Sequence, residues 1–522
     1  MIINRIKLKK FLISYLFSTG VLGHMIIISG ILLIPLYFQE PVNFFFERIT
    51  NTLAHFSHGK KQQVGHLLLK TKLINDWKTP AIEPFVILQP ISQWKGQGAS
   101  ANQNSLLPNK NAIYIHSSKQ LFSAIKKVQP GETIIIMPGT YTFNGRSIPI
   151  TQHGKATAPI TLKSSRLGSV KLKFNLSEGF HVKAAHWIFE NLDIQGTCSH
   201  DSYCEHAFHV VGKAKYFVLK NNIIHDFNAA IKVNGVNISG QAQFPDNGVI
   251  EKNTFYNKHH RQTANPVTLL NINSVNNWRV RGNLISDFSK AKGDHTSYGT
   301  FMKGNGKNGI FENNLIICER NLPPNEGIRI GLSFGGGGTG KSYCRNQDCS
   351  TEFSNGIIRN NIIMHCSHDV GIYLNKAKNT QIYNNLIFNT LGIDVRYSTS
   401  SATIHNNIIS GRIKNRNEAS HFASHNIIDY NCLSSSRDFS DCSFFSWFRD
   451  LNAADLILVN GEEILAQGKK IKSLTTDFCT NKRSENIDIG PIQYSNNQLC
   501  TPNNMEIKVS KPKPQSADSS GY

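Results

Sequence analysis

Two basic side chains in the second half of the chain are of types that can carry out acid–base chemistry. Lys303 lies in the segment GTFMKG, and Arg329 follows 26 residues later in GIRIG. A lysine whose pKa is lowered by neighbouring cations can act as a general base, and an arginine can bind a carboxylate through two hydrogen bonds. These groups suit removal of the weakly acidic C5 proton of a uronate sugar. That reaction needs a base and neutralisation of the sugar carboxylate.

His295 and Tyr298 precede Lys303 and are the alternatives for the proton transfers. An imidazole titrates near neutral pH, and either side chain can act as base or as proton donor to the leaving oxygen. The same groups would also serve a uronate C5 epimerase, which returns a proton to the opposite face of the sugar. An isolated Lys or Arg on a surface is usually only solvated, so the residues around these groups decide their role.

The candidate residues lie within a series of internal repeats. Eight segments consist of a short apolar strand, a turn with Asn and a second short apolar strand, as in NGIIRNNIIMHCS at 355–367. The aligned asparagines are spaced by 31, 31, 30, 31, 47, 24 and 22 residues: Asn191, Asn222, Asn253, Asn283, Asn314, Asn361, Asn385 and Asn407. This period, without helix-length patterns, predicts stacked coils. The predicted fold is therefore all-β, a right-handed parallel β-helix whose asparagines hydrogen-bond from coil to coil.

A further strand in each coil carries polar residues at alternate positions. Alternation directs one set of side chains outward, and equivalent positions on neighbouring coils lie about 4.8 Å apart. The predicted outward set is Lys232, Asn271, Phe301, Lys303, Arg329, Tyr373, Asn375, Asp394 and Arg396. The residues expected to bind substrate within this set are Lys232, Asn271, Tyr373, Asn375 and Arg396. The loops are longest at the middle coils, so we expect them to form the walls of a cleft there.

Composition divides the chain into six parts. The predicted parts are a basic N-terminus (1–10), a transmembrane anchor (11–38), a spacer (39–110), the β-helix (111–425), a terminal coil with a cap (426–500) and a disordered tail (501–522). The anchor segment has no Asp, Glu, Lys or Arg and is long enough to cross a bilayer. Ser117 and Gln120 predict the start of a helix that covers the open N-terminal end of the solenoid.

The charges around the apolar segment predict its orientation. Four basic residues precede it, which places the N-terminus in the cytoplasm and the rest outside. We therefore expect the protein in the cell envelope, on the periplasmic or extracytoplasmic side, anchored to the inner membrane, or secreted if the segment is a cleaved signal peptide. The ten cysteines agree with export, because none forms C-x-x-C and an even number favours disulfides over zinc ligation.

Net charge indicates the class of partner. The 522 residues include 56 Lys and Arg against 35 Asp and Glu, a formal net charge of +21. With 17% charged and 40% hydrophobic residues, the chain is neither a disordered polyelectrolyte nor a multi-pass membrane protein. A basic protein suits a polyanion. No nucleic-acid-binding module is recognisable, so we expect an acidic polysaccharide as partner, besides the membrane. A non-catalytic glycan-binding or structural β-helix stays open as an alternative.

Two segments near the ends of the repeats resemble a known family. QLFSAIKKVQPGETIIIMPGTYTFNGRSIPIT (120–151) resembles the N-terminal entry of right-handed β-helix polysaccharide lyases, especially the chondroitinase B and alginate lyase family. TTDFCTNKRSENIDIGPIQY (475–494) is similar to the closing segment of many carbohydrate-active β-helices. The resemblance implies cleavage of an acidic polysaccharide by β-elimination. It also implies that Lys303 and Arg329 match the family's catalytic Lys and the Arg on the next coil.

The same resemblance bears on calcium. The family has two glutamates shortly before the catalytic Lys that bind calcium. In the matching stretch, GDHTSYGTFMKG (293–304), Thr296 and Tyr298 stand in their places and only Asp294 is acidic. In addition, Ile330 follows Arg329 where the family has a histidine. The sequence therefore predicts no cofactor, with calcium kept as the alternative although the family's Glu ligands are not matched.

Overall fold

The structure, a computed structural model, describes residues 98–100, 111–323, 326–336, 339–434 and 438–494. The predicted N-terminus, anchor and tail lie outside these residues, as does nearly all of the predicted spacer. Within the described part of the chain, no helix is long and apolar enough to span a bilayer.

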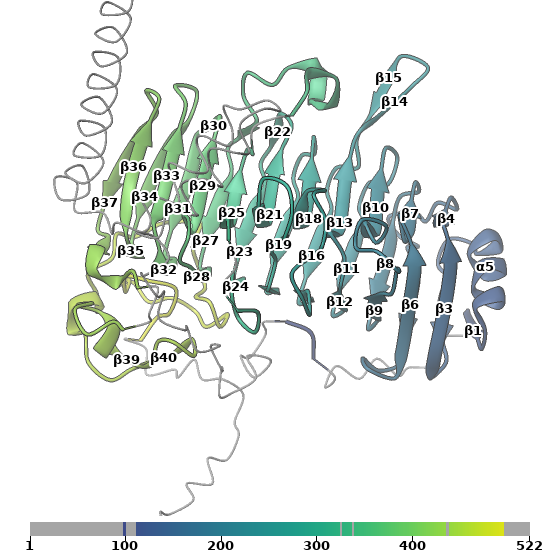
Figure 1. Ribbon diagram of the computed structural model, residues 1–522, viewed down its shortest axis with the longest axis horizontal. Helices are drawn as coiled ribbons and strands as arrows, with labels where there is room; N and C mark the ends of the chain where they lie inside the picture. The colour runs from purple at the N-terminus through teal and green to yellow at the C-terminus, as the bar shows by residue number, and fades with distance from the viewer. Residues whose placement is uncertain (1–97, 101–110, 324–325, 337–338, 435–437, 495–522) are drawn as a thin grey trace, which may run out of the picture. The chain divides into compact units, whose positions relative to one another are not determined.

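The repeats form a parallel β-helix, as predicted (Figure 1). Among the described residues, each complete coil contributes a strand to each of three long sheets. The twelve-stranded sheet contains β1 (Ala112–Ile115), β2 (Thr133–Ile136), β5 (Ile160–Ser164), β8 (Trp187–Glu190), β11 (Val218–Lys220), β16 (Val249–Glu251), β19 (Arg279–Arg281), β23 (Ile310–Glu312), β27 (Ile357–Arg359), β31 (Thr380–Tyr383), β34 (Ser401–His405) and β37 (Ser420–Ser424).

The second and third sheets complete the coils. The eleven-stranded sheet contains β3 (Gly139–Gly145), β6 (Val170–Leu176), β9 (Asp193–Gly196), β12 (Ile223–His225), β17 (Thr254–Tyr256), β20 (Leu284–Ser286), β24 (Leu315–Ile317), β28 (Ile362–Cys366), β32 (Leu386–Thr390), β35 (Ile408–Ser410) and β38 (Ile427–Asp429). The ten-stranded sheet contains β4 (Ile148–Ile150), β7 (Phe180–Val182), β10 (His206–Val211), β13 (Ala229–Asn234), β18 (Val267–Asn273), β21 (Thr296–Lys303), β25 (Ile328–Phe334), β29 (Ile372–Asn375), β33 (Gly392–Arg396) and β36 (Arg412–Arg416).

Smaller elements lie outside the three sheets. The three-stranded sheet contains β22 (Gly306–Lys307), β26 (Phe353–Ser354) and β30 (Ala377–Lys378). Two hairpins are formed by β14 (Val236–Ile238) with β15 (Gln241–Gln243), and by β39 (Phe448–Asp450) with β40 (Asp455–Leu458). Short 3-10 turns are η2 (Lys341–Tyr343), η3 (Arg345–Gln347), η4 (Tyr430–Cys432), η5 (Phe445–Trp447) and η6 (Glu462–Ile464).

Buried asparagines connect successive coils, as the repeat predicts. The amide oxygen of Asn314 accepts from the backbone N–H of Asn283 at 3.1 Å, and the same contact recurs on the coils from Asn222 to Asn426. The ladder extends one coil further than the sequence suggests, because Asn426 accepts from the N–H of Asn407 at 2.9 Å. The alignment of Asn191 is wrong by one residue, since Leu192 donates to the amide oxygen of Asn222.

The interior is filled by apolar columns that run along the solenoid axis. Equivalent isoleucines of the eleven-stranded sheet stack in register, for example Ile285, Ile316 and Ile363. Each of these side chains is fully buried, and such burial contributes about 1.5–3 kcal/mol per residue. Because every coil covers the apolar face of its neighbour, the stack supplies the rigid frame on which the outward residues are fixed.

Different segments cover the end and one side of the solenoid. The helix α5 (Ser118–Lys127) begins where predicted, with the Ser117 hydroxyl accepting from the N–H of Gln120 at 3.2 Å. Residues 438–494 run back along the coils, where their apolar side chains pack against the outer face of the eleven-stranded sheet. Asn360, for example, donates to the Thr476 carbonyl at 2.8 Å.

Disulfides close several loops. The bonded pairs are Cys198–Cys204, Cys318–Cys366, Cys344–Cys349 and Cys432–Cys442. Cys479 is also disulfide-bonded, and its partner lies outside the described residues. Among the described residues no cysteine is free, in agreement with the expectation of disulfides.

Candidate functional site

The outer face of the ten-stranded sheet carries a row of polar and aromatic residues in register. Parallel pairing places one residue of the row on each coil. In order from β7 to β33 the row is His181, His209, Lys232, Asn271, Phe301, Ser333, Tyr373 and Asp394. Lys303 lies two residues beyond Phe301 and pairs with Asn273. The row therefore extends from a histidine cluster, past two lysines, to an aromatic and acidic end.

Lys303 is held at the C-terminal end of β21. Its ammonium lies 4.6 Å from the centre of the Phe301 ring. The side chain passes close to Gly336, where an added Cβ would lie 3.1 Å from the Lys303 Cδ atom. Burial lowers the pKa of Lys303, while the carboxylate of Glu352 acts in the opposite direction. The result is a lysine that loses its proton more readily than one in water.

Lys232 lies two coils away from Lys303 and is fixed by an amide. Its Nζ atom donates to Oδ1 of Asn271 at 3.0 Å, and the same oxygen accepts from Nδ2 of Asn273 at 2.6 Å. Burial, together with the positive charge of Lys303, lowers the pKa of Lys232 to about 8. From the spacing of strands and residues, the Cα atoms of the two lysines are about 12 Å apart. Their side chains thus form an electrostatically coupled pair.

Tyr373, Asn375 and Arg396 form a second polar group on the next coils. The Tyr373 hydroxyl accepts from Nδ2 of Asn375 at 2.9 Å and from the guanidinium of Arg396 at 3.3 Å. Arg396 also donates to Asn417 at 3.0 Å and lies over the ring of Tyr397. The structure therefore brings these predicted binding residues together on the same face as Lys232 and Asn271.

Arg329 does not lie on this face, so its predicted outward position is wrong. It pairs in register with Ser297 rather than with Phe301, and it is 1% exposed. Its guanidinium forms an ion pair with Glu319 at 2.6 Å and contacts Nδ1 of His368 at 2.9 Å. This ion pair lowers the pKa of Glu319 to about 2 although burial acts against it.

Strand irregularity explains the error in the position of Arg329. Tyr298 and Phe301 are three residues apart, yet their rings contact each other edge to face at 5.4 Å. Strict alternation would place them on opposite faces. The alternation of inward and outward side chains is interrupted at Gly299. Because glycine has no side chain, the sequence pattern gives no sign of this interruption. On the next strand Ile330, which directly follows Arg329, packs in a cluster with Tyr373 of the outward row.

His295 and Tyr298 are separated from Lys303 by the length of β21. At about 3.3 Å per residue, the Cα atom of His295 is about 26 Å from that of Lys303, and that of Tyr298 about 16 Å. Burial raises the pKa of the Tyr298 hydroxyl. The structure thus does not bring these two alternatives together with Lys303.

The stretch that precedes Lys303 does not fit calcium. Calcium prefers several oxygen ligands that include carboxylates. The carboxylate of Asp294 forms an ion pair with Lys290, and the N–H of Thr296 donates to it. Tyr298 supplies only a buried phenol. We therefore derive no step through calcium.

A disulfide-closed loop covers the end of β21 beside Lys303. Residues 341–349 contain η2, η3 and the bond Cys344–Cys349. Arg345 fixes this loop: its guanidinium donates to Asp246 at 2.5 Å and lies 3.9 Å from the Phe244 ring centre, while its N–H donates to the carbonyl of Gly304 at 2.9 Å. The predicted long-loop wall is therefore present on this side of the lysine.

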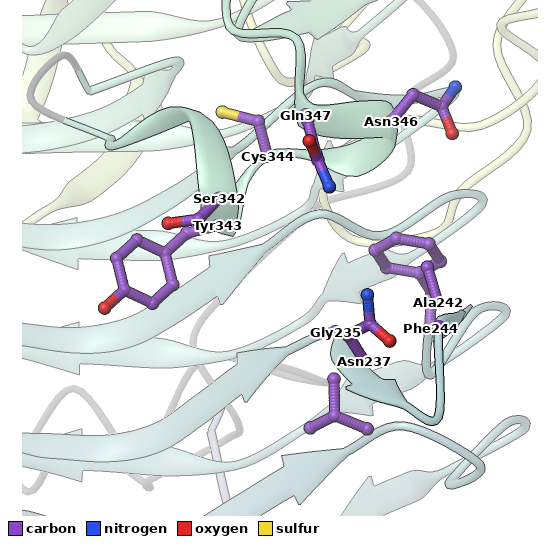
Figure 2. A pocket seen from close by; sticks show the side chains of 11 residues that line it. Gly235, Asn237, Ala242, Phe244, Ser342, Tyr343, Cys344, Asn346 and Gln347 are labelled. Atoms are coloured by element: carbon purple, nitrogen blue, oxygen red, sulfur yellow. The ribbon is translucent and has the colours of Figure 1, made fainter.

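The loop and the β14–β15 hairpin enclose a pocket. Both project from the same edge of the solenoid (Figure 1). Figure 2 shows Gln347 on the loop pointing toward Asn237 and Phe244 on the hairpin side, and Tyr343 and Asn346 also line the pocket from the loop. The pocket has a volume of about 240 Å³. It lies beyond the C-terminal end of β13, the strand that carries Lys232.

The sequence did not single out several residues that complete the site. Asn273 donates to Asn271, the acceptor of Lys232, and Glu352 influences the pKa of Lys303. Ser333 occupies the place in the row that was assigned to Arg329. Asn273 follows Asn271 by two residues, so alternation contained the signal for it. Glu352 lies in a long loop, and no sequence pattern there indicates that its carboxylate comes close to Lys303.

Comparisons with known proteins agree with this fold. No protein-family model matches the sequence. A segment of 122 residues is 28% identical to pectate lyase L of Dickeya chrysanthemi, and this match covers 19% of this chain and 29% of that protein. The chain is therefore similar to less than a third of the length of this curated relative.

Solved structures with a similar fold include other polysaccharide lyases. Pectate lyase Pel9A aligns with a TM-score of 0.44 and 15% identity over 71% of this chain and 90% of its own. A PL6 family polysaccharide lyase from Pseudopedobacter saltans aligns with a TM-score of 0.33 and 14% identity, over 63% of this chain and 94% of its own. The predicted resemblance to polysaccharide lyases is met by the short match to pectate lyase L, and the β-helix itself is established by the three long sheets of stacked coils.

Proposed function

We propose that this protein cleaves an acidic, uronate-containing polysaccharide by β-elimination, with Lys303 as the base. The observation that carries the proposal is the pair of partly buried lysines on the outer face of the ten-stranded sheet, Lys232 and Lys303, whose pKa values are both lowered by burial. A cationic pair suits a polyanion, and a lysine with a lowered pKa suits proton abstraction near neutral pH.

The two lysines have different surroundings, and these divide the work between them. Lys232 donates to Asn271 and is therefore held in place, which suits a group that binds and neutralises the carboxylate of the sugar. Lys303 has the ring of Phe301 beside it and no hydrogen-bond acceptor for its Nζ atom among the described residues. We therefore assign the role of base to Lys303. Lys232 takes the role of the cation that binds the sugar carboxylate, which the sequence had suggested for Arg329.

The elimination balances with these groups alone. The neutral Nζ of Lys303 takes the C5 proton, the electrons of that C–H bond form the C4–C5 double bond, and the bond from C4 to the glycosidic oxygen breaks. The leaving oxygen receives a proton from the Lys303 ammonium or from water. The products are one fragment with a new reducing end, whose anomeric oxygen has taken the proton, and one fragment with a 4,5-unsaturated uronate at its non-reducing end.

The neighbouring groups would bind adjacent sugars. Tyr373 offers a ring and a hydroxyl, and Asn375 and Arg396 offer donors to hydroxyls and carboxylates. Oδ1 of Asn375 is buried and has no hydrogen-bond partner among the described residues. Such an acceptor suits a sugar hydroxyl, because leaving it unpaired costs about 1–3 kcal/mol.

We further propose that the enzyme acts outside the cytoplasm. The disulfides agree with an oxidising compartment. The apolar segment 11–38 and the basic residues before it support an inner-membrane anchor with the β-helix on the extracytoplasmic side. No cofactor enters this proposal, and added calcium should leave the rate unchanged.

The test follows the ultraviolet absorbance of unsaturated uronates when the full chain is incubated with alginate, pectate, dermatan sulfate or heparin. We expect absorbance to rise with at least one polymer, and Lys303→Met to abolish the rise. Lys232→Met should lower kcat and raise KM, since it removes both the binding and the neutralisation of the carboxylate. Lys307→Met is the matched control, because Lys307 is an exposed lysine four residues beyond Lys303.

The alternatives have different outcomes in the same samples. A flat trace with exchange of solvent deuterium at C5 would replace the lyase by an epimerase. A flat trace with polymer binding but no exchange would indicate a glycan-binding protein. Full activity in Lys303→Met would refute the assignment of the base.

A further inference from the structure

Glu178, His181 and His209 form a cluster at the N-terminal part of the outward row. Glu178 lies in the turn before β7, His181 in β7 and His209 in β10. One ligand atom of each, a carboxylate oxygen or a ring nitrogen, lies within 4.8 Å of those of the other two. The imidazoles are stacked in parallel with centres 5.0 Å apart. Their side chains are 17–18% exposed, so the group is shielded but open to solvent.

Hydrogen bonds around His209 determine which ring nitrogen carries the proton. Nδ2 of Asn234 donates to the Gly235 carbonyl at 2.9 Å, so its Oδ1 atom is the one that faces His209. That oxygen lies 2.8 Å from Nε2 of His209 and can only accept. Nε2 therefore carries the proton, and in the neutral ring Nδ1 presents a lone pair. Orientation of a metal-binding imidazole through its other nitrogen is the usual arrangement.

The lone pair of His209 faces another acceptor. Nδ1 of His209 is 3.7 Å from Oε1 of Glu178, and Nδ1 of His181 is 3.4 Å from Oε2. Nδ1 of His209 and Oε2 of Glu178 are buried and have no hydrogen-bond partner among the described residues. Zinc bonds of about 2.0–2.1 Å in a tetrahedron place ligand atoms about 3.4 Å apart, close to the separations seen here.

Positive groups surround the cluster and oppose a cation. Arg146 lies 3.4 Å from Oε1 of Glu178, but its side chain is 79% exposed and can turn away. Lys183 and Lys232 are near enough to influence the histidines. A hard cation held by charge alone would therefore bind poorly. Imidazole nitrogens favour a transition metal, for which the bonds to the ligands matter more than the net charge.

We propose that Glu178, His181 and His209 bind a divalent transition metal, with zinc as the best fit. Two histidines and a carboxylate leave the fourth position of a zinc ion open. Lys232 follows His209 by one coil in the same row, about 5 Å away between Cα atoms. The cluster therefore belongs to the same outward row as the lysines, and an open position on the metal suits an oxygen ligand such as a carboxylate.

The test measures zinc itself, and so does not depend on the lyase proposal. The full chain is stripped of metal, and Zn²⁺ is titrated in competition with a chromophoric chelator. We expect a site that holds one zinc ion per chain and that His181→Gln and His209→Gln each abolish. Asn234→Ala should weaken it by about 10–100-fold, because it frees the ring of His209. His421→Gln, in β37 at the other end of the solenoid, is the matched control and should bind normally.

Two results would overturn the proposal. One is a wild-type chain that does not compete with the chelator. The other is zinc binding that persists unchanged in both histidine variants. Urea unfolding of the metal-free variants shows that they are folded, and X-ray absorption of the wild-type complex should show two histidine nitrogens. Zinc binding without lyase activity would refute only the proposed function. Lyase activity without zinc binding would refute only the metal site.

Discussion

Replacing one asparagine of the buried ladder should destabilise the whole solenoid. Asn314 occupies the middle coils and is fully buried. Its side-chain oxygen accepts from the N–H of Asn283 at 3.1 Å and from Nδ2 of Asn283 at 3.0 Å. Its own amide donates to the Val280 carbonyl at 2.9 Å and to Oδ1 of Asn361 at 3.0 Å. Asn314→Ala removes all four bonds and leaves no side chain that can replace them.

The four lost bonds do not have equal effects. Nδ2 of Asn283 keeps the Ile250 and Arg281 carbonyls as acceptors, both at 3.0 Å. The N–H of Asn283 keeps no acceptor that the structure describes. A buried donor left unsatisfied costs about 1–3 kcal/mol, and each of the other lost bonds about 0.5–1.5 kcal/mol. We therefore expect the free energy of unfolding to fall by about 3–5 kcal/mol.

Urea unfolding with the disulfides intact measures this change. Asn175→Ala is the matched control, because Asn175 also donates to an asparagine of the preceding coil, Asn144, at 3.1 Å, but on the exposed surface. It should cost no more than about 0.5 kcal/mol. A loss below about 1 kcal/mol for Asn314→Ala, or an equal loss in both variants, would refute the view that the ladder stabilises the stack.

Three further predictions concern the charged groups. Arg329→Met leaves the Glu319 carboxylate buried without its cation and should lower the free energy of unfolding by about 3–5 kcal/mol. The wild-type ion pair contributes fully above pH 4.5 and is lost as pH falls towards 2, because Glu319 has a lowered pKa; acid titration of stability in urea should show this loss only in the wild type. Glu352→Gln removes a charge that raises the pKa of Lys303. The part of the kcat–pH profile in which kcat rises with pH should therefore move to lower pH. A profile that does not move would contradict Lys303 as the base. Lys303→Met should raise the pKa of Lys232 above about 8, as measured by nuclear magnetic resonance of its methylated amine; an unchanged value would show that the two lysines are not coupled.

Local pattern predicted the fold and part of the site. Short apolar strands with a buried Asn at each turn identify the β-helix without knowledge of any long-range contact, since each coil repeats the same local arrangement. Lys232 and Asn271 were correctly placed on the outer face, because inward and outward side chains alternate regularly in their two strands. Arg329 was placed wrongly because the alternation of side chains is interrupted at a glycine. The residue types at that point do not indicate which face of the sheet the following side chains occupy.

The sequence by itself determined the repeat, the ladder and the outward face, because these depend on a period of one coil and on side-chain alternation. Only the tertiary structure decided which charged groups meet. Lys303 and Glu352 are brought together by a long loop, and Glu178, His181 and His209 by the stacking of two coils. The pKa of a lysine, or the affinity of two histidines for a metal, depends on burial and on neighbours distant in sequence. These are properties of the folded chain that no local pattern contains.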